Sequence, residues 1–225
     1  MDFLSRAVPL YGEGGRERLS RARVCVLGLG GVGAACAEAL VRAGVGSLVF
    51  VDGDTYSETN KNRQLYATDK TLFQNKALVA ALRAREINPA AEVVSRETFY
   101  RAGDAFDFRG VDFICDCIDD VAAKLDLIRS AVEQNTPIVS AMGAGGKLDP
   151  TRFRVTDISK THTCPLAKKM RVELRKMGIL HLPVVFSDEV SQAVTTPPSS
   201  VSFVPPVMGF VMAGYVVKTL LHKDG

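Results

Sequence analysis

The chain has 225 residues, a length typical of one large domain. Hydrophobic residues make up 47% of it and charged residues 24%, which are ordinary globular values and exclude extensive disorder. The net charge of +3 is too small for a module dedicated to nucleic acid, but it permits a nucleotide or tRNA partner.

The first predicted elements form a strand–helix–strand unit. Residues 23–27 are a short apolar run of the kind found in buried parallel strands, and residues 32–43 carry small and apolar side chains at helical spacing. Gly44 and Gly46 end that helix, and residues 47–51 are the next predicted strand. The sequence therefore predicts a βαβ unit at the start of the chain.

The same alternation continues to about residue 140. We expect helices over 75–86 and 121–133, and strands over 92–95, 112–115 and 137–140. Strands that alternate with helices form a mostly parallel, twisted sheet with helices on both faces. The predicted fold class is therefore α/β, of the Rossmann-like type.

The last third of the chain extends this core. It is expected to hold a strand over 153–157, a basic helix over 165–177, a short strand over 184–186, a polar loop over 190–202 and an apolar helix over 207–221. That helix is short and interrupted by glycine, so we expect it to be buried in the protein, with no membrane contact.

No repeat or linker divides the sequence. We therefore predict a single domain over residues 1–225, with a nucleotide-binding core at about 20–145 and an extension on the substrate and dimer side at about 146–225. No basic stretch followed by an apolar core opens the chain, so no signal peptide is expected.

The five cysteines indicate a cytoplasmic protein. Their number is odd and no Cys-x-x-Cys pair occurs, which argues against a disulfide framework and against zinc knuckles. Cys25, Cys115 and Cys117 lie in or beside apolar runs, where a reduced thiol behaves as a small buried hydrophobe.

A glycine-rich turn, Gly28-Leu-Gly30-Gly31-Val-Gly33, joins the first predicted strand to its helix. The first glycine permits a tight turn, the second lets the backbone approach phosphate, and the third lets the helix pack on the strand. Asp52 follows at the end of the second strand, where a carboxylate accepts hydrogen bonds from ribose hydroxyls. A solvated loop acid is the alternative, but the combination predicts a nucleotide site.

Cations just beyond the second strand favour ATP over a dinucleotide. Arg63 can bond two phosphate oxygens at once, and Lys76 is a compact point charge. Lys76 opens a helix, where a cation opposes the helix dipole, and a bound phosphate would explain its position. Two solvated surface cations are the alternative. An NAD-dependent dehydrogenase has no comparable need for these groups.

A second acidic run, residues 116–120, follows the strand expected at 112–115. The carboxyl ends of parallel strands meet at one crevice, so this run should face the same ligand. Asp119 is expected to hold Mg²⁺ against the phosphates, because that ion favours one or two carboxylates plus phosphate oxygens. Asp120 is expected either to cap the next helix or to contact the adenine side.

Together these residues resemble the ubiquitin-activating-enzyme-like adenylating family, over about residues 20–145. The matching positions are Gly28 to Gly33, Asp52, Asp54, Asn60, Arg63, Gln64, Lys76 and Asp119. The resemblance implies that this set holds ATP and Mg²⁺ and that a carboxylate is adenylated. It also implies a homodimer in which an arginine near the partner's N-terminus reaches the phosphates, with Arg6 as the best counterpart and Arg16 as the reserve.

With Asn60 to Gln64, motifs in the second half make the chain similar, over nearly its whole length, to the tRNA threonylcarbamoyladenosine dehydratases. It carries Met-Gly-Ala-Gly-Gly-Lys at 142–147, Asp-Ile-Ser-Lys at 157–160, Cys-Pro-Leu-Ala at 164–167 and Ser-Phe-Val-Pro-Pro at 202–206. This similarity implies that ATP activates the threonyl carboxylate of a modified adenosine beside the tRNA anticodon, after which a ring closes with loss of water.

Two alternatives to that function remain. One is an adenylyltransferase for the C-terminal carboxylate of a ubiquitin-like or sulfur-carrier protein, against which the missing zinc knuckles count. The other is a nucleotide-binding partner protein without catalysis, which would not need a Mg²⁺ carboxylate such as Asp119.

The helix expected over 165–177 leaves two questions open. Its cations are Lys168, Lys169, Arg171, Arg175 and Lys176. They are either a solvated face or contacts to tRNA phosphates. Cys164, just before the helix, is either a structural thiol or a nucleophile activated by the helix dipole, in which case a sulfur-transfer protein is a candidate partner.

Overall fold

The computed structural model describes residues 2–192, 195 and 198–222. Its strands are β1 Arg23–Leu27, β2 Ser47–Val51, β3 Glu92–Arg96, β4 Phe113–Asp116, β5 Ile138–Ala141, β6 Phe153–Asp157 and β7 Pro183–Ser187. Its α-helices are α1 Val8–Arg21, α2 Gly31–Ala43, α3 Lys76–Ile87, α4 Val121–Glu133, α5 Pro165–Lys176 and α6 Val204–Leu221. Short 3₁₀ turns are η1 Glu58–Asn60, η2 Pro150–Arg152 and η3 Ile158–Lys160.

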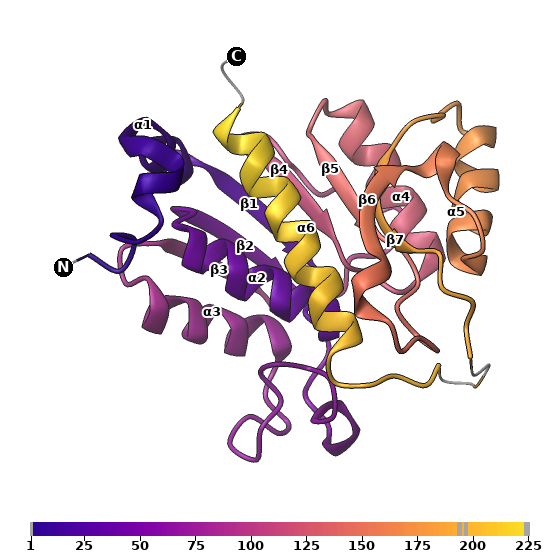
Figure 1. Cartoon of the computed structure of the whole chain (residues 1–225), viewed down its shortest axis with the longest axis horizontal. Helices are drawn as coiled ribbons and strands as arrows, with labels where there is room; N and C mark the ends of the chain where they lie inside the picture. The colour runs from indigo at the N-terminus through magenta and orange to yellow at the C-terminus, as the bar shows by residue number, and fades with distance from the viewer. Residues whose placement is uncertain (1, 193–194, 196–197, 223–225) are drawn as a thin grey trace.

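The strands form one sheet in the order β3-β2-β1-β4-β5-β7-β6, with helices on both faces (Figure 1). The pairs from β3 across to β7 are parallel, and β6 runs antiparallel to β7 at the edge. The predicted α/β fold class is therefore confirmed. The parallel strands place their carboxyl ends along one edge, where ligands bind in sheets of this kind.

Helix α1 was not expected from the sequence. Its residues are rich in glycine, which has low helix propensity, and Gly12 breaks the helix with φ of 70°. Leu19 nevertheless lies fully buried against the core. Tertiary packing therefore sets this helix, which explains why local periodicity did not indicate it.

Helix α6 begins at Val204, three residues before the predicted start, because proline fits the first turn of a helix. It lies along α2 (Figure 1), and a Cβ at Gly209 would lie 2.2 Å from the carbonyl oxygen of Val32. α6 is long and apolar enough to span a membrane, but half of it is buried inside the protein. The C-terminal helix is thus a core helix on its inner side.

The described residues of the loop expected over 190–202 form no helix or strand. Residues 193–194 and 196–197 lie outside the described residues. Two backbone hydrogen bonds tie its ends to the segment after β5. The N–H of Gly146 donates to Ser199 O at 2.8 Å, and the N–H of Gln192 donates to Gly146 O at 2.7 Å.

Candidate active site

A cleft of about 340 Å³ lies at the carboxyl ends of β1, β2 and β4. It is lined by Gly28, Gly30, Gly31, Asp52, Asp54, Arg63, Gln64, Lys76 and Asp119, all of which the sequence predicted for the site. The other predicted residues, Gly33, Asn60, Asp120 and Arg6, do not line it.

The glycine turn gives the cleft its floor. Gly28 has φ of 86°, and a Cβ there would lie 2.6 Å from the carbonyl oxygen of Cys117. Gly33 lies outside the lining because α2 packs on the turn at that point: a Cβ on Gly33 would lie 1.7 Å from Gly28 O. A Cβ on Gly30, in contrast, would have Gln64 Nε2 as its nearest neighbour, 3.9 Å away. Backbone at Gly30 is therefore open to a phosphate.

Asp52 is held from two sides at the end of β2. Its carboxylate accepts hydrogen bonds from the N–H of Leu29 at 2.6 Å and of Asp54 at 2.8 Å. Burial raises the pKa of Asp52, and the two N–H donors and Lys76 oppose that shift. The carboxylate is thereby fixed in one orientation beside the glycine turn.

Lys76 is the first residue of α3 and only 5% exposed. Its ammonium donates to the carboxylate of Asp54 and lies 5.8 Å from the ring centre of Tyr56. Asp54 thus balances a cation that would otherwise oppose the helix dipole. A phosphate in the cleft would compete with Asp54 for this cation.

The turn that follows η1 carries Arg63 and Gln64 into the cleft. Arg63 Nη1 donates to Thr59 O at 3.0 Å and to Asn62 Oδ1 at 2.8 Å. Oε1 of Gln64 is buried and has no hydrogen-bond partner within the described residues. An unpartnered buried acceptor in a cleft is a candidate ligand contact.

Asn60 acts from outside the cleft. Its Oδ1 accepts from the N–H of Ser57 at 3.1 Å, and its carbonyl oxygen accepts from the N–H groups of Arg63 and Gln64. Asn60 does not line the cleft, and its contact with ATP stays a prediction from the resemblance. Asn60 shapes the turn that presents Arg63 and Gln64 to the cleft.

The two acids after β4 have different environments. Asp119 is exposed, lines the cleft and makes no hydrogen bond or ion pair within the described part of the chain. Asp120 is the N-cap of α4, and its Oδ1 accepts from the N–H of Ala123 at 2.8 Å. Of the two roles expected for Asp120, the structure thus has the helix cap.

A buried polar network beneath this run was missed by sequence reasoning. The carboxylate of Asp116 accepts from Lys124 Nζ at 2.7 Å, from Ser140 Oγ at 2.6 Å and from the N–H of Ile118 at 3.1 Å. Asp116, Lys124 and Ser140 are fully buried. One signal was available: Lys124 stands at helical spacing from Leu127 and so on the apolar face of α4.

A second cavity of about 450 Å³ adjoins the cleft, and Asp119 lines both. One wall is Met142 and Gly143 after β5, and another is Cys164 and Leu166 at the start of α5. The walls are closely packed, because a Cβ on Gly143 would lie 3.3 Å from Cys164 Sγ. Two molecules bound in the two cavities would therefore meet at Asp119.

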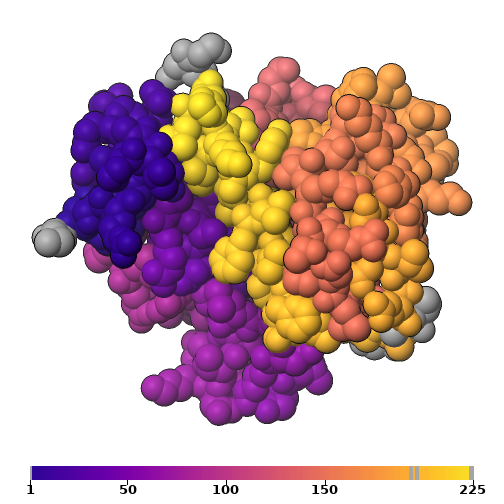
Figure 2. Space-filling model, in the orientation of Figure 1, coloured from indigo at the N-terminus to yellow at the C-terminus, as the bar shows by residue number. Residues whose placement is uncertain are grey.

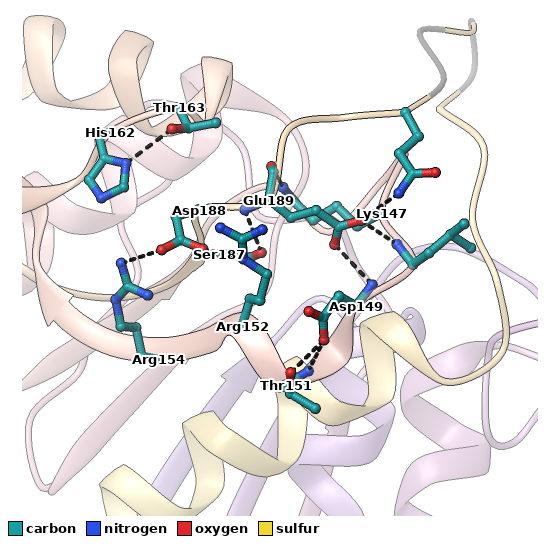
Figure 3. A network of polar contacts seen from close by, with 12 residues as sticks. Lys147, Asp149, Thr151, Arg152, Arg154, His162, Thr163, Ser187, Asp188 and Glu189 are labelled. Carbon is teal, nitrogen blue, oxygen red and sulfur yellow. Dashed lines mark hydrogen bonds and ion pairs between the residues drawn. The ribbon is translucent and has the colours of Figure 1, made fainter.

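The segment after β7 fixes the wall of the second cavity (Figure 3). The buried carboxylate of Glu189 accepts from the N–H of Leu148 at 2.8 Å and of Asp149 at 3.0 Å, and Lys147 Nζ donates to Glu189 O. These bonds hold the loop after β5, which includes Lys147 in the cavity lining. No pattern in the sequence indicated this pairing.

A neighbouring group stabilises the sheet edge. Asp188 accepts from Arg152 Nε at 2.6 Å and Arg154 Nη2 at 2.7 Å (Figure 3). The guanidinium groups of Arg154 and Arg152 lower the pKa of Asp188 to about 2.

Arg6 lies away from its own cleft. Leu4 packs on Gly44, where a Cβ would lie 2.7 Å from Leu4 Cδ1. Gly44 ends α2, whose first residue lines the cleft, so the segment with Arg6 lies toward the opposite edge of the sheet. The Arg6 side chain is exposed and makes no hydrogen bond or ion pair within the described residues, whereas Arg16 pairs with Asp2.

Comparisons with known proteins agree over nearly the full length. The ThiF family model matches residues 4–225. The tRNA threonylcarbamoyladenosine dehydratase of Bacillus subtilis is 41% identical in an alignment 242 residues long. The alignment covers 98% of this chain and 94% of the relative. The crystal structure of the Escherichia coli tRNA N6-threonylcarbamoyladenosine dehydratase with ATP superposes with a TM-score of 0.92 at 34% identity, covering 99% of this chain and 96% of the other. Its AMP complex has the same TM-score and identity over 97% and 93%.

Proposed function

The chain belongs to the ThiF family, and on that premise we propose that it is an ATP-dependent tRNA-modifying enzyme. It adenylates the threonyl carboxylate of threonylcarbamoyladenosine in tRNA, and ring closure with net loss of water follows. The relatives matched over nearly the whole chain are named tRNA threonylcarbamoyladenosine dehydratases, so the sulfur-carrier alternative is not favoured.

The observation that carries the proposal is the meeting of two cavities at Asp119. The cleft offers the glycine turn, Asp52, Arg63 and Lys76 to ATP, while the second cavity, with its mainly apolar walls, has room for a purine and its side chain. A carboxylate that enters through the second cavity therefore reaches the phosphates beside Asp119. This arrangement suits adenylation, which depends on position and charge stabilisation.

The reaction that we propose has two steps. A carboxylate oxygen attacks the α-phosphorus of ATP, and the bond to the departing pyrophosphate breaks. Arg63 and Lys76 stabilise the phosphate charge during this step. The carbamoyl oxygen of the same group then attacks the activated carbonyl carbon and expels AMP, while an N–H proton is released. The oxygen lost from the nucleoside leaves in AMP.

Asp119 fits a Mg²⁺ ion that is bound together with ATP. Its carboxylate faces the cleft without a protein partner, and Mg²⁺ prefers one or two carboxylates plus phosphate oxygens. No group of three or more metal-ligating side chains occurs among the described residues, so the ion would arrive with the phosphates. When bound, it neutralises charge on the leaving pyrophosphate.

The active form is a homodimer in which Arg6 reaches the partner's phosphates. Arg6 is exposed, unpaired within the described residues and remote from its own cleft. α1 and α6 lie side by side (Figure 2), and each carries an exposed apolar side chain, since Leu10 of α1 is 85% exposed and Phe210 of α6 is 47% exposed. An apolar surface of this kind is what a second copy would cover.

The chain works as one domain in the cytoplasm. α6 belongs to the extension yet packs along α2 of the nucleotide-binding core, so the two parts share one hydrophobic core. All five cysteines are free, as in a reducing compartment. Cys164 is 3% exposed and serves as a structural thiol, and a sulfur-transfer protein as partner stays a prediction from the resemblance.

The test is to incubate the protein with ATP, Mg²⁺ and tRNA bearing threonylcarbamoyladenosine, digest the tRNA and weigh its nucleosides. We expect a loss of the mass of one water that requires ATP and disappears in Asp119→Ala and Arg63→Ala. An unchanged nucleoside in the presence of an ATP-binding wild-type protein would refute the assignment of substrate.

Mixing two inactive variants tests the dimer. Arg6→Ala damages the partner's site, and Asp119→Ala damages its own site. A mixed dimer then contains one site with both defects and one with neither, so the mixture should regain activity. If the mixture stays inactive although mixed dimers form, Arg6 does not act across the interface.

A further inference from the structure

Positive charge is concentrated in one short segment. Residues 160–176 contain six Lys or Arg and one acid, whereas the other 208 residues contain 22 Lys or Arg and 24 Asp or Glu. The overall net charge of +3 is therefore the sum of +5 in this segment and −2 in the rest of the chain. Such local concentration is the electrostatic mark of a site for a polyanion.

Four of the six cations of this segment lie along one side of α5. Lys168 and Lys169 are exposed, and Arg175 and Lys176 follow two turns later, about 10 Å along the axis. We call these four residues the α5 strip. The packed side of α5 is different: Ala167, Met170 and Leu174 are buried in the core.

The strip has little internal charge compensation. Glu173 pairs with Lys176 at 2.8 Å, and no contact of Lys168, Lys169 or Arg175 with an acid occurs within the described residues. Arg171 has another task, since its Nη1 donates to Thr161 O at 2.9 Å and to Thr161 Oγ1 at 2.6 Å. That bond fixes α5 on the preceding loop, so the strip is presented by a rigid helix.

The strip begins next to the second cavity. Cys164, Pro165 and Leu166 line that cavity, and Lys168 follows within one helical turn, about 5 Å along the axis. α5 lies at the outer end of the sheet, beside α4 and far from α1 (Figure 1). A chain that leaves the second cavity along α5 therefore meets cations at once.

We propose that the α5 strip binds the phosphate backbone of the tRNA next to the modified nucleoside, while the modified base occupies the second cavity. This inference rests on the proposed function and adds the surface that orients the RNA. Backbone contacts position the substrate without reading sequence, which fits a strip made only of Lys and Arg. An acidic protein partner would meet the same charges, and an unchanged tRNA affinity in the strip variant below is the outcome that would favour such a partner.

The test compares two double charge reversals. Lys168→Glu with Lys169→Glu alters the strip. Arg21→Glu with Arg109→Glu makes the same charge change before β1 and β4, at the edge of the sheet opposite the cleft, and serves as the control. Affinity for tRNA is measured between 50 and 200 mM salt, together with ATP binding and the melting temperature.

The strip variant should bind tRNA at least roughly tenfold more weakly, with a salt dependence reduced by about two units, because each phosphate contact contributes about 0.7–0.9 to that slope. ATP binding and melting temperature should stay near wild type. The control should keep both the affinity and the slope, and Lys168→Arg with Lys169→Arg should restore binding.

A second readout separates this inference from the proposed function. Dehydration of the free modified nucleoside should be equal in wild type and strip variant, while dehydration within tRNA should fall through KM. If wild-type protein leaves both substrates unchanged, the proposed function fails. If wild type is active and the strip variant keeps wild-type affinity and salt slope for tRNA, the strip is not the RNA surface.

Discussion

The nucleotide cleft and the second cavity meet at Asp119 but are built differently. In the cleft, the contacts that hold Asp52, Arg63 and Lys76 all lie within residues 29–76: Asp52 accepts from Leu29 and Asp54, Arg63 donates to Thr59, and Lys76 donates to Asp54. The wall of the second cavity depends on Glu189, which bonds backbone about forty residues earlier. The nucleotide chemistry can therefore be carried by local motifs, whereas the substrate side forms only with the complete fold.

The largest expected effect is on the network that underlies both regions. Lys124→Met leaves the carboxylate of Asp116 buried without its cation, which should cost about 3–5 kcal/mol of unfolding free energy. Urea unfolding measures this loss. Asp116→Asn combined with Lys124→Met removes both charges and should recover much of the stability. Equal stability of wild type and Lys124→Met would show that the ion pair contributes nothing.

The next effect separates chemistry from stability at two adjacent acids. Asp119→Ala should lower kcat roughly 10²–10³-fold, about 2.7–4 kcal/mol, because charge stabilisation of the transition state is lost. The melting temperature should change little, because Asp119 makes no hydrogen bond or ion pair within the described residues. Asp120→Ala should do the reverse, costing about 1 kcal/mol of stability through the lost cap while turnover persists. A similar loss of turnover in both variants would contradict the division of roles.

A smaller effect should be confined to the second cavity. Glu189→Gln replaces one acceptor oxygen by an NH2 group, so it loses one of the two hydrogen bonds from backbone and weakens the other, and we expect a loss of about 2 kcal/mol in stability. KM for tRNA should rise while ATP affinity stays the same, because the cleft is held by other contacts. Glu86→Gln, on the surface of α3, is the control. Equal weakening of ATP and tRNA binding would mean that the two regions are not independent.

The difference between the regions explains what the sequence could predict. The strand and helix periods, the glycine turn and Asp52 lie within short windows, and the predicted helix at 121–133 matches α4. The lining of the cleft by Arg63, Lys76 and Asp119 was likewise foreseeable, because parallel strands bring their carboxyl ends together.

The remainder depends on long-range packing. Glu189 lies in a stretch without any local motif, and its partners are distant in the chain. Asn60 was assigned to the ATP site from the family resemblance, and its local bond to the N–H of Ser57 could not be predicted because residue type alone does not distinguish a ligand contact from a turn cap. Helix α1 has poor intrinsic propensity and forms against the core, so periodicity could not indicate it.

The smallest expected effect concerns Asp188, at the edge of the second region. The guanidinium groups of Arg154 and Arg152 lower its pKa to about 2, below the unfolded value of about 3.9. A carboxyl whose pKa is lower in the folded state stabilises the protein above the unfolded pKa, and this contribution declines as pH falls through the folded pKa. The urea midpoints of wild type and Asp188→Asn should therefore differ slightly at pH 5 and converge toward pH 2, since exposed pairs contribute little. Arg154→Met should reduce the same pH dependence, because it removes the largest cause of the shift. A difference between wild type and Asp188→Asn that is constant from pH 5 to the acid limit would show that the ion pairs do not set this pKa.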